Sequence, residues 1–578
     1  MQISNIKRAN QKLFQLNSKH RNIFLSTLLS ILFINCLSLY AQTSTQNFNR
    51  TRSFDVQHYL IRTSFDRQSK KIFGDTTISF KPLGKELKTI ELDASGLNFE
   101  SVKLVLNGKD LSFSTEDDRV IIQLDRKYSS ADLIKIRLKY SAAPKKGVYF
   151  IDEETDGDTI TRDAQVWTQG EPEEAHYWFP SYDFPDDKAT SEQYITVEAG
   201  ETAISNGELL ETLTNSNGTK TFHFLMNIPH STYLTSFVIG KYSKSSDLYK
   251  NIPLGIYVYP GKEHLFKSAF GKTKEMMRIY EELTGIAFPY NKYDQTIVAG
   301  FKFGGMENIT ATTFADTEIF FGDFNQNIVE DVVSHELAHS WFGNLVTCRN
   351  WAELWLNEGF ATFMEAAYRE KMYGRDEYLG KIKDDARDYF IEEARKRQKR
   401  GLFNQLARPD DSIFDTVTYQ KGGAVIHTLR ETVGDKVFWK AINVYLNKYK
   451  LANVETTDLQ RVFEETSKKD LNWFFKQWVY GTGYPKLEYN YQYDEQTKIL
   501  TLNINQTQKS EDSTISQFIL PIEIEITTLK GVVNEKLRIT KREETFSIKL
   551  DDELTQFIID KDLKIPLKKL KLIQTSEK

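Results

Sequence analysis

The pattern of apolar and polar positions divides the chain into three blocks. From about residue 52 to residue 242, apolar and polar residues alternate in short runs such as 102–106, 120–124 and 133–140. Turn signals, including Asn107-Gly108, separate these runs. Alternation with a period of two, broken by such turns, is typical of β-strands. The first block is therefore predicted to be a β domain.

The second block begins near residue 251 and has helical spacing. Between His264 and Gly285, apolar residues recur every three or four positions, and Gly285 is a helix stop signal. A strand is predicted at 296–299. Further helices are predicted at 327–343, 357–373, 376–398, 421–433, 435–449, 457–467 and 470–480. After Pro485 the alternation returns, which predicts a short second β block.

A chain of 578 residues is too long for a single hydrophobic core. The three blocks predict a multidomain α+β protein. Its expected parts are a leader at 1–41, an N-terminal β domain at 42–244, a mixed, helix-rich domain at 245–484 and a C-terminal β domain at 485–578.

The leader has the features of a secretory signal. Its first 22 residues contain five basic residues and no acidic one, an apolar run extends from Ile23 to Ala41, and polar sequence begins at Gln42. We expect an exported protein, periplasmic or secreted, with Ala41 the last residue removed. The apolar run approaches the length of a membrane span, so an uncleaved membrane anchor is the alternative. A membrane is an expected partner only in that case.

Charge and cysteine content narrow the possible partners and bonds. The formal net charge is −5, and removing the five basic leader residues makes it −10. A mildly acidic protein gives no reason to expect nucleic acid as a partner. Of the two cysteines, Cys36 lies in the leader, so Cys348 alone remains after cleavage and cannot form an intramolecular disulfide. Cys348 is predicted to be a buried, inert thiol.

One short motif indicates metal chemistry. His335-Glu336-Leu337-Ala338-His339 lies within an apolar-periodic segment. Positions four apart share one face of a helix, so both imidazoles can reach the same ion. Glu336 lies about 100° round the helix from His335 and can approach the open side of that ion. This is the HExxH arrangement of zinc peptidases.

A third metal ligand is predicted at Glu358. A catalytic zinc site has three protein ligands and keeps a fourth position for water. Glu358 follows His339 after eighteen intervening residues and opens a second helical stretch that can run back against the first. The metal lowers the pKa of its water to about 7, and Glu336 is then the natural general base.

A second motif provides a family resemblance. Gly304-Gly305-Met306-Glu307-Asn308, together with HExxH and the later glutamate, resembles the GxMEN signature of the gluzincin aminopeptidases, the relatives of aminopeptidase N and leukotriene hydrolase. The resemblance extends from about residue 50 to the end of the chain. It implies a saddle-like N-terminal β domain, a thermolysin-like catalytic domain and a small C-terminal β-sandwich. It also implies one Zn²⁺ per chain and peptide substrates with a free N-terminus.

The resemblance also assigns roles to individual residues. Glu307 matches the carboxylate that binds the substrate's α-ammonium, and Tyr419 matches the tyrosine that hydrogen-bonds the developing oxyanion. Gln169-Gly170-Glu171 looks like the family's QxE segment, in which Glu171 is a second carboxylate for the amine and Gln169 lines the first subsite. Gly304 and Gly305 would let the backbone run alongside the substrate.

Part of the family pattern is missing from this sequence. Many members carry a large helical C-terminal domain, whereas the residues after Tyr484 are predicted to form strands. That domain is expected to be missing, and epoxide hydrolysis, found in one branch of the family, is unsupported.

The leading hypothesis is an exported zinc aminopeptidase that removes single residues from free peptide N-termini. Two alternatives stay open. A thermolysin-like endopeptidase would use the same metal site, and an inactive peptidase fold would act as a binding protein. Glu307 in its Gly-Gly-Met-Glu-Asn context argues against the first, and the complete set of chemical groups argues against the second.

Overall fold

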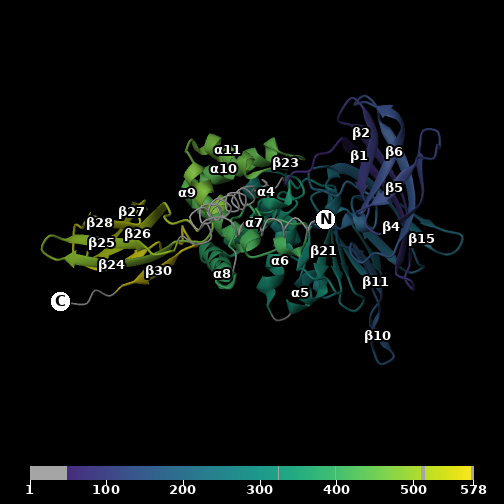
Figure 1. The fold of residues 1–578 in the computed structure, drawn as a ribbon. Helices are drawn as coiled ribbons and strands as arrows, with labels where there is room; N and C mark the ends of the chain where they lie inside the picture. Colours follow the sequence, from purple (N-terminus) through teal and green to yellow (C-terminus); the bar gives the residue numbers. More distant parts are fainter. Residues whose placement is uncertain (1–47, 323–324, 397–398, 510–513, 574–578) are drawn as a thin grey trace, which may run out of the picture. The chain divides into compact units, whose positions relative to one another are not determined.

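The computed structural model describes residues 48–322, 325–396, 399–509 and 514–573 (Figure 1). The predicted leader at 1–41 lies outside the described residues. Among the helices in these ranges, none is both long enough and apolar enough to cross a membrane.

The first block consists mainly of strands, as its alternation predicts. Its largest sheet has seven strands in the order β14-β15-β12-β1-β2-β7-β4. The central strands β1 and β2 are antiparallel, whereas β1 and β12 are parallel. The bounds are β1 (Phe54–Asp66), β2 (Lys71–Pro82), β4 (Leu97–Leu104), β7 (Ile134–Ala142), β12 (Ala189–Val197), β14 (Glu208–Thr214) and β15 (Lys220–His230).

Two smaller sheets and a hairpin complete this block. A three-stranded sheet contains β3 (Leu87–Asp93), β6 (Arg119–Tyr128) and β5 (Phe113–Glu116). A four-stranded sheet contains β13 (Thr202–Ser205), β16 (Phe237–Gly240), β11 (Gln165–Thr168) and β8 (Val148–Ile151). The hairpin pairs β9 (Glu154–Asp156) with β10 (Thr159–Arg162). Strand β11 matters most for function, because it leads directly into Gln169-Gly170-Glu171.

The middle block begins with a five-stranded sheet and continues as helices (Figure 1). The sheet order is β17-β18-β19-β21-β20, which places the short strand β20 at one edge. The bounds are β17 (Ser243–Tyr249), β18 (Ile252–Val258), β19 (Tyr293–Val298), β20 (Gly305–Met306) and β21 (Ala311–Ala315).

Ten α-helices are described in this block. They are α3 (Leu265–Ser268), α4 (Thr273–Thr284), α5 (Asp316–Phe321), α6 (Gln326–Ala338), α7 (Trp355–Tyr373), α8 (Arg375–Glu393), α9 (Gly422–Val433), α10 (Asp435–Lys448), α11 (Thr456–Ser467) and α12 (Asn472–Phe475). A short parallel pair, β22 (Thr347–Cys348) with β23 (Asn453–Val454), lies between them in the sequence. Cys348 is fully buried and unbonded, as predicted, and burial raises the pKa of its thiol.

Several predicted helices have different bounds in the structure. The helix predicted at 376–398 ends at Glu393, and the one predicted at 470–480 is α-helical over Asn472–Phe475 and continues as a π-helix over Lys476–Tyr480. The helix predicted at 264–285 is interrupted between α3 and α4, and Gly271, a weak helix former, lies in the interruption. The helix predicted at 327–343 ends at Ala338, because the chain turns immediately after His339 and reaches a positive φ of 121° at Gly343. This turn brings the Phe342 carbonyl back toward the His339 ring.

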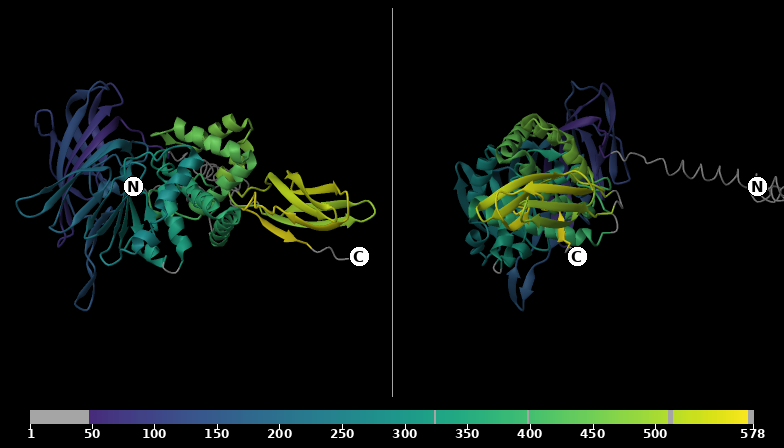
Figure 2. Two further views of the ribbon diagram at one scale, coloured as in Figure 1. Left: turned by 180° about the vertical axis from the view of Figure 1, so that it is seen from behind. Right: turned by 90° about the vertical axis from the view of Figure 1, so that its left-hand side faces the viewer.

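The last block contains two antiparallel-rich sheets, drawn in yellow in Figure 2. One has the order β28-β25-β24-β30 and the other β27-β26-β29. In both, alternate residues are buried, for example Leu500 and Leu502 in β25 and Ile522 and Ile524 in β26. The bounds are β24 (Lys486–Asp494), β25 (Ile499–Gln506), β26 (Leu520–Thr528), β27 (Gly531–Ile539), β28 (Glu543–Lys549), β29 (Leu554–Ile559) and β30 (Lys569–Leu572). The predicted fold class, a β-rich N-terminal region followed by a helical middle, is confirmed.

Candidate active site

Helix α6 carries three of the predicted metal-site residues. Asn325 caps its N-terminus by accepting a hydrogen bond from the Asn327 N–H. Near the other end, His335 and Glu336 lie in the last helical turn and His339 is the C-cap residue. The i and i+4 spacing therefore places both imidazoles on one face, as the sequence predicts.

The third predicted ligand meets these imidazoles from the next helix. Glu358 lies in the first turn of α7 and is 2% exposed. Its Oε2 is 3.1 Å from His335 Nε2 and 3.3 Å from His339 Nε2. Burial alone would raise the pKa of Glu358, but the two imidazoles lower it to about 2. The carboxylate is therefore held in its charged form, which is the form that coordinates a metal.

Each imidazole is also held from its other nitrogen. His335 Nδ1 is 2.7 Å from Glu365 Oε1, and His339 Nδ1 is 2.8 Å from the Phe342 carbonyl oxygen. Because both acceptors lack a proton, each Nδ1 is the N–H donor, which leaves Nε2 as the nitrogen that can bind a metal. Burial lowers the pKa of each imidazole, but the nearby carboxylates, Glu358 among them, raise it above the usual value, so a metal would displace the proton on each Nε2. Glu365 itself forms an ion pair with buried Lys381 at 2.9 Å. These contacts fix the rings with Nε2 directed toward Glu358.

Glu365 is a functional residue that sequence reasoning missed. It lies seven residues after Glu358 on α7, about two helical turns along the same face. That spacing was the available signal, and an outer carboxylate is the usual partner of a metal-binding histidine.

The residues present fit a zinc ion. Ligand atoms of His335, His339 and Glu358 lie within 4.8 Å of one another and include two imidazole nitrogens and one carboxylate oxygen. This donor set is the one found in catalytic zinc sites that keep an open position.

Glu336 lies in the same cleft, and one of its carboxylate oxygens lies within 4.8 Å of a ring nitrogen of His339. One carboxylate oxygen, Oε2, is buried and has no hydrogen-bond partner within the described parts of the chain. Burial, with added repulsion from Glu307 and Glu358, raises the pKa of Glu336 to about 8 against the opposing effect of the two histidines. A Cβ atom added to Gly305 would overlap this carboxylate, whereas one added to Gly304 would come no closer than 3.6 Å to Val332. Of these two glycines, Gly305 is the one whose surroundings leave no room for a Cβ atom.

Two further carboxylates form one end of the cleft. Glu171 follows β11, Glu307 follows β20, and oxygens of both lie within 4.8 Å of the Glu358 carboxylate. Each has a buried Oε1 for which the described residues offer no hydrogen-bond donor. Burial raises the pKa of both carboxyls, and at Glu171 the charge of Glu307 adds to the effect. A cation entering this space would restore the charged form of both groups.

The other residues of the two motifs hold this end of the cleft in place. The Gln169 side-chain nitrogen donates to the Glu171 carbonyl at 3.1 Å and lies 3.3 Å from the Met306 sulfur. The side chain of Asn344 donates to the Glu307 carbonyl at 2.8 Å. Asn308 is buried, its side-chain nitrogen donates to Thr313, and it is not among the residues that line the cleft.

Tyr419 also lines the cleft. It lies in a π-helical turn, Val417–Lys421, and its ring stacks on His335 with centroids 5.8 Å apart and an interplanar angle of 18°. Burial and the nearby glutamates raise the pKa of its phenol, which keeps the hydroxyl protonated and able to donate. A cavity of about 460 Å³ contains all of the predicted site residues except Asn308.

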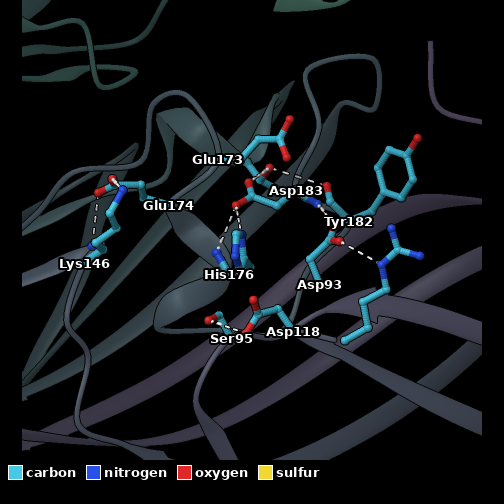
Figure 3. A network of polar contacts seen from close by, with 12 residues as sticks. Asp93, Ser95, Asp118, Lys146, Glu173, Glu174, His176, Tyr182 and Asp183 are labelled. Atoms are coloured by element: carbon cyan, nitrogen blue, oxygen red, sulfur yellow. Dashed lines mark hydrogen bonds and ion pairs between the residues drawn. The ribbon is translucent and has the colours of Figure 1, made fainter. Parts of the chain in front are cut away.

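A polar network supports the loop that carries Glu171 (Figure 3). His176 donates to the Asp183 carboxylate at 2.8 Å, and the Asp183 N–H donates to Asp93 at 2.9 Å. Within the same loop, Glu173 accepts a hydrogen bond of 2.7 Å from the Trp351 indole. Trp351 lies just before α7, so this bond connects the Glu171 loop with the helix that bears Glu358.

The fold and the site define a class of protein. The parts of a metallopeptidase site are present: an HExxH helix, a third ligand from the following helix, a free carboxylate beside them and an edge strand along the cleft.

Comparison with known proteins identifies the family within that class. The Peptidase M1 N-terminal domain matches residues 55–234, and the Peptidase family M1 domain matches residues 268–478. Together the two matches cover more than half of the chain, and the chain belongs to peptidase family M1, the gluzincin aminopeptidases. The resemblance predicted from the sequence motifs is confirmed.

Individual relatives agree with this assignment. The chain is 28% identical to Aminopeptidase 2 of Candida albicans over 86% of this chain and 54% of that protein. It is 32% identical to Aminopeptidase N of Streptomyces lividans over 56% of this chain and 39% of that protein. It is 28% identical to Leucyl aminopeptidase of Saccharolobus solfataricus over 74% of this chain and 54% of that protein. The chain spans between 39% and 54% of the length of these relatives.

Proposed function

We propose that the chain is a zinc aminopeptidase that hydrolyses the first peptide bond of substrates with a free N-terminus. One observation supports this most strongly. The paired, buried carboxylates of Glu171 and Glu307 have unpartnered oxygens, in the described part of the chain, directly beside the metal-ligand set. A cation-binding end to the cleft selects a substrate whose scissile bond lies next to an ammonium group.

His335, His339 and Glu358 would hold one Zn²⁺ per chain, which when bound supplies a Lewis acid and lowers the pKa of water. Glu336 takes the proton from the attacking water and later gives it to the leaving amine. Glu171 and Glu307 bind the α-ammonium, so the first carbonyl is the one positioned for attack. Tyr419 donates a hydrogen bond to the oxygen that becomes negative.

The deciding experiment compares a free aminoacyl amide with the same compound acetylated on its amine. Purified, zinc-loaded protein should cleave the free amine far faster. Equal rates on both compounds would instead support the endopeptidase alternative. Zinc content measured alongside separates a missing metal from a missing activity.

We also propose that the protein is exported. The support is the basic, apolar and polar order of residues 1–42. N-terminal sequencing of the protein recovered outside the cytoplasm should begin at Gln42, whereas an intact leader in a membrane fraction would show that the segment is an anchor.

A further inference from the structure

A groove lies between helix α8 and strand β30 with the segment that leads into it, and we call it the α8–β30 groove (Figure 1). Its volume of about 640 Å³ is in the middle of the range of about 300–1,000 Å³ for ligand pockets. Among the described residues, none lines both this groove and the main cleft. The inference below therefore does not depend on the proposed hydrolytic activity.

Most of the lining of the α8–β30 groove is apolar. Ile391 is 46% exposed and Leu570 is 39% exposed, although both are large apolar residues. The Phe390 ring is held in place by Tyr484, with ring centroids 4.5 Å apart. The apolar lining includes Ala386, Phe390, Ile391, Ala394, Pro566 and Leu570. Apolar side chains that gather in one exposed groove mark an interaction site.

The rest of the lining is basic, and it consists of Lys383, Arg387, Lys568 and Lys569. Lys568 is compensated by Asp560 at 2.5 Å, and Arg387 pairs with exposed carboxylates on its own helix. Lys383 and Lys569 form no ion pair with any described residue, and Lys569 lies over the Phe390 ring at 5.3 Å. A positive groove on a protein with a net charge of −5 favours an anionic ligand.

Strand β30 adds the edge of a sheet to this groove. It is the last strand in the order β28-β25-β24-β30, and it runs parallel to β24. The Lys569 and Ile573 N–H groups donate to carbonyl oxygens on the β24 side at 3.0 and 2.8 Å. In a parallel pair, alternate residues bond to the same neighbour, so the backbone groups of Leu570 and Leu572 face the open edge. Leu570 therefore belongs to both the groove and the edge.

The combination of groove, charge and strand edge favours a polypeptide over other anions. A bilayer presents a flat surface that does not fill a groove, and an acyl chain cannot pair with backbone N–H and C=O groups. An extended polypeptide can pair with β30 while every second side chain enters the groove. Its apolar side chains would contact Ile391 and Leu570, and its acidic side chains would pair with Lys383 and Lys569.

We propose that the α8–β30 groove is a docking site for an extended polypeptide segment in which apolar and acidic residues alternate, and that this segment binds by adding a strand to the open edge of β30. Burial of apolar side chains supplies the affinity, and the uncompensated lysines select against basic segments.

The test uses the zinc-loaded full chain and a fluorescent octapeptide of alternating leucine and glutamate. Its N-terminus is acetylated so that it offers no free amine to the main cleft. Fluorescence anisotropy should give a Kd on the order of 1–100 μM, and a peptide with lysine in place of glutamate should bind at least about tenfold more weakly. Equal affinity for the two peptides, or no binding at about 1 mM, would overturn the proposal.

Substitutions locate the binding in the groove. Ile391→Ser and the double variant Lys383→Glu with Lys569→Glu should each weaken binding of the leucine–glutamate peptide by about tenfold or more. Leu133→Ser and Lys139→Glu, at exposed positions of the first block, are the matched controls and should bind like the unmodified chain. Zinc content and the unfolding temperature, measured on every variant, show that the protein is folded. Unchanged affinity in both groove variants would refute the assignment.

A modified peptide tests the addition of a strand without changing the protein. Methylation of every second backbone nitrogen keeps the side chains but removes the N–H groups that would pair with β30, so affinity should fall at least about tenfold in one of the two possible registers. Equal affinity in both registers would contradict pairing with β30. Binding to phosphatidylglycerol vesicles in place of the peptide would overturn the proposal in favour of a lipid surface.

Discussion

Glu365 Oε1 lies 2.7 Å from His335 Nδ1, on the opposite side of the imidazole from Glu358. The ring is thus held between two carboxylates on one helix, and only its Nε2 faces the ligand set. Outer partners of this kind set the orientation and basicity of a metal-binding histidine.

We therefore predict that Glu365→Gln weakens zinc binding by about 10- to 100-fold, because the amide is a poorer acceptor for the His335 N–H. Competition with a chromogenic chelator measures this directly. Glu377→Gln, an exposed carboxylate on the neighbouring helix α8, is the control and should bind zinc like the unmodified chain. Equal affinities for both variants would show that Glu365 has no part in positioning His335.

Glu336→Gln should reduce kcat by about 10²- to 10⁴-fold while zinc remains bound, because the amide cannot accept the water proton. Activity assays are paired with metal analysis of the same samples. Retention of high activity in a zinc-replete variant would contradict the role of Glu336 as general base.

Glu307→Ala should raise KM by about 10- to 100-fold for substrates with a free amine, since a charge-assisted contact is lost. A free α-amino group titrates near about 8, so affinity for the unmodified enzyme should weaken above that pH. In the variant, KM should depend less on pH in this alkaline range. KM measured from pH 6 to 9.5 tests both points, and a limb of unchanged steepness would argue against an ammonium at Glu307.

The two glycines of the motif should differ in their tolerance of a side chain. Gly305→Ala would push a methyl group into the Glu336 carboxylate, whereas Gly304→Ala meets only ordinary contacts. We predict that Gly305→Ala loses at least about tenfold more kcat/KM than Gly304→Ala, because displacement of a catalytic group by about 1 Å can cost 10²-fold. Similar losses in the two variants would mean that the close approach is unimportant.

Stability should fall in acid partly through a buried histidine that is not one of the cleft residues. His427 on α9 is fully buried, its Nε2 lies 2.8 Å from the Leu563 carbonyl oxygen, and burial lowers its pKa to about 4. An unfolded histidine titrates near about 6.5, so the unfolded state binds the extra proton first as the pH falls. The stabilising contribution is complete above about pH 6.5 and is lost as the pH falls toward 4. Between pH 6.5 and 5 the loss is about 2 kcal/mol.

Thermal unfolding of the unmodified chain and of His427→Gln at pH 7 and pH 5 tests this assignment. The variant should show a smaller decrease between the two pH values. His264→Gln, at an exposed histidine, should behave like the unmodified chain. An identical decrease in all three proteins would assign the acid sensitivity to other groups.

The parts of the site that follow from local geometry could be predicted from the sequence. The spacing of His335 and His339 needs only a helix, and Glu358 needs only a second helix running back. The positions of Glu307, Tyr419 and Glu171 depend on the family resemblance, because nothing within a few residues of each marks it. The roles of these residues, and the domain boundaries at 41, 244 and 484, stay predictions.

The contacts that sequence reasoning missed join distant segments. Glu173 and Trp351 are 178 positions apart, and the ring of Phe303, in the loop before β20, meets the ring of Phe414 with centroids 5.2 Å apart. Such pairings are set by how sheets and helices pack, which neither periodicity nor motif spacing reports. The break between α3 and α4 was missed for a related reason. The helical spacing of apolar residues continues through Gly271, whereas the helical backbone conformation is interrupted there.

The carboxylates that would bind the N-terminal ammonium group of a peptide come from two different domains. Glu171 belongs to the strand-rich block and Glu307 to the sheet that precedes α6. The zinc-type ligands and the base, in contrast, all belong to one. Hydrolysis and the choice of which bond to hydrolyse are therefore physically separable. Small shifts at the junction between the two domains, such as a change at the Glu173–Trp351 hydrogen bond, would change which peptide bond is placed at the metal site. They would not alter how that bond is hydrolysed.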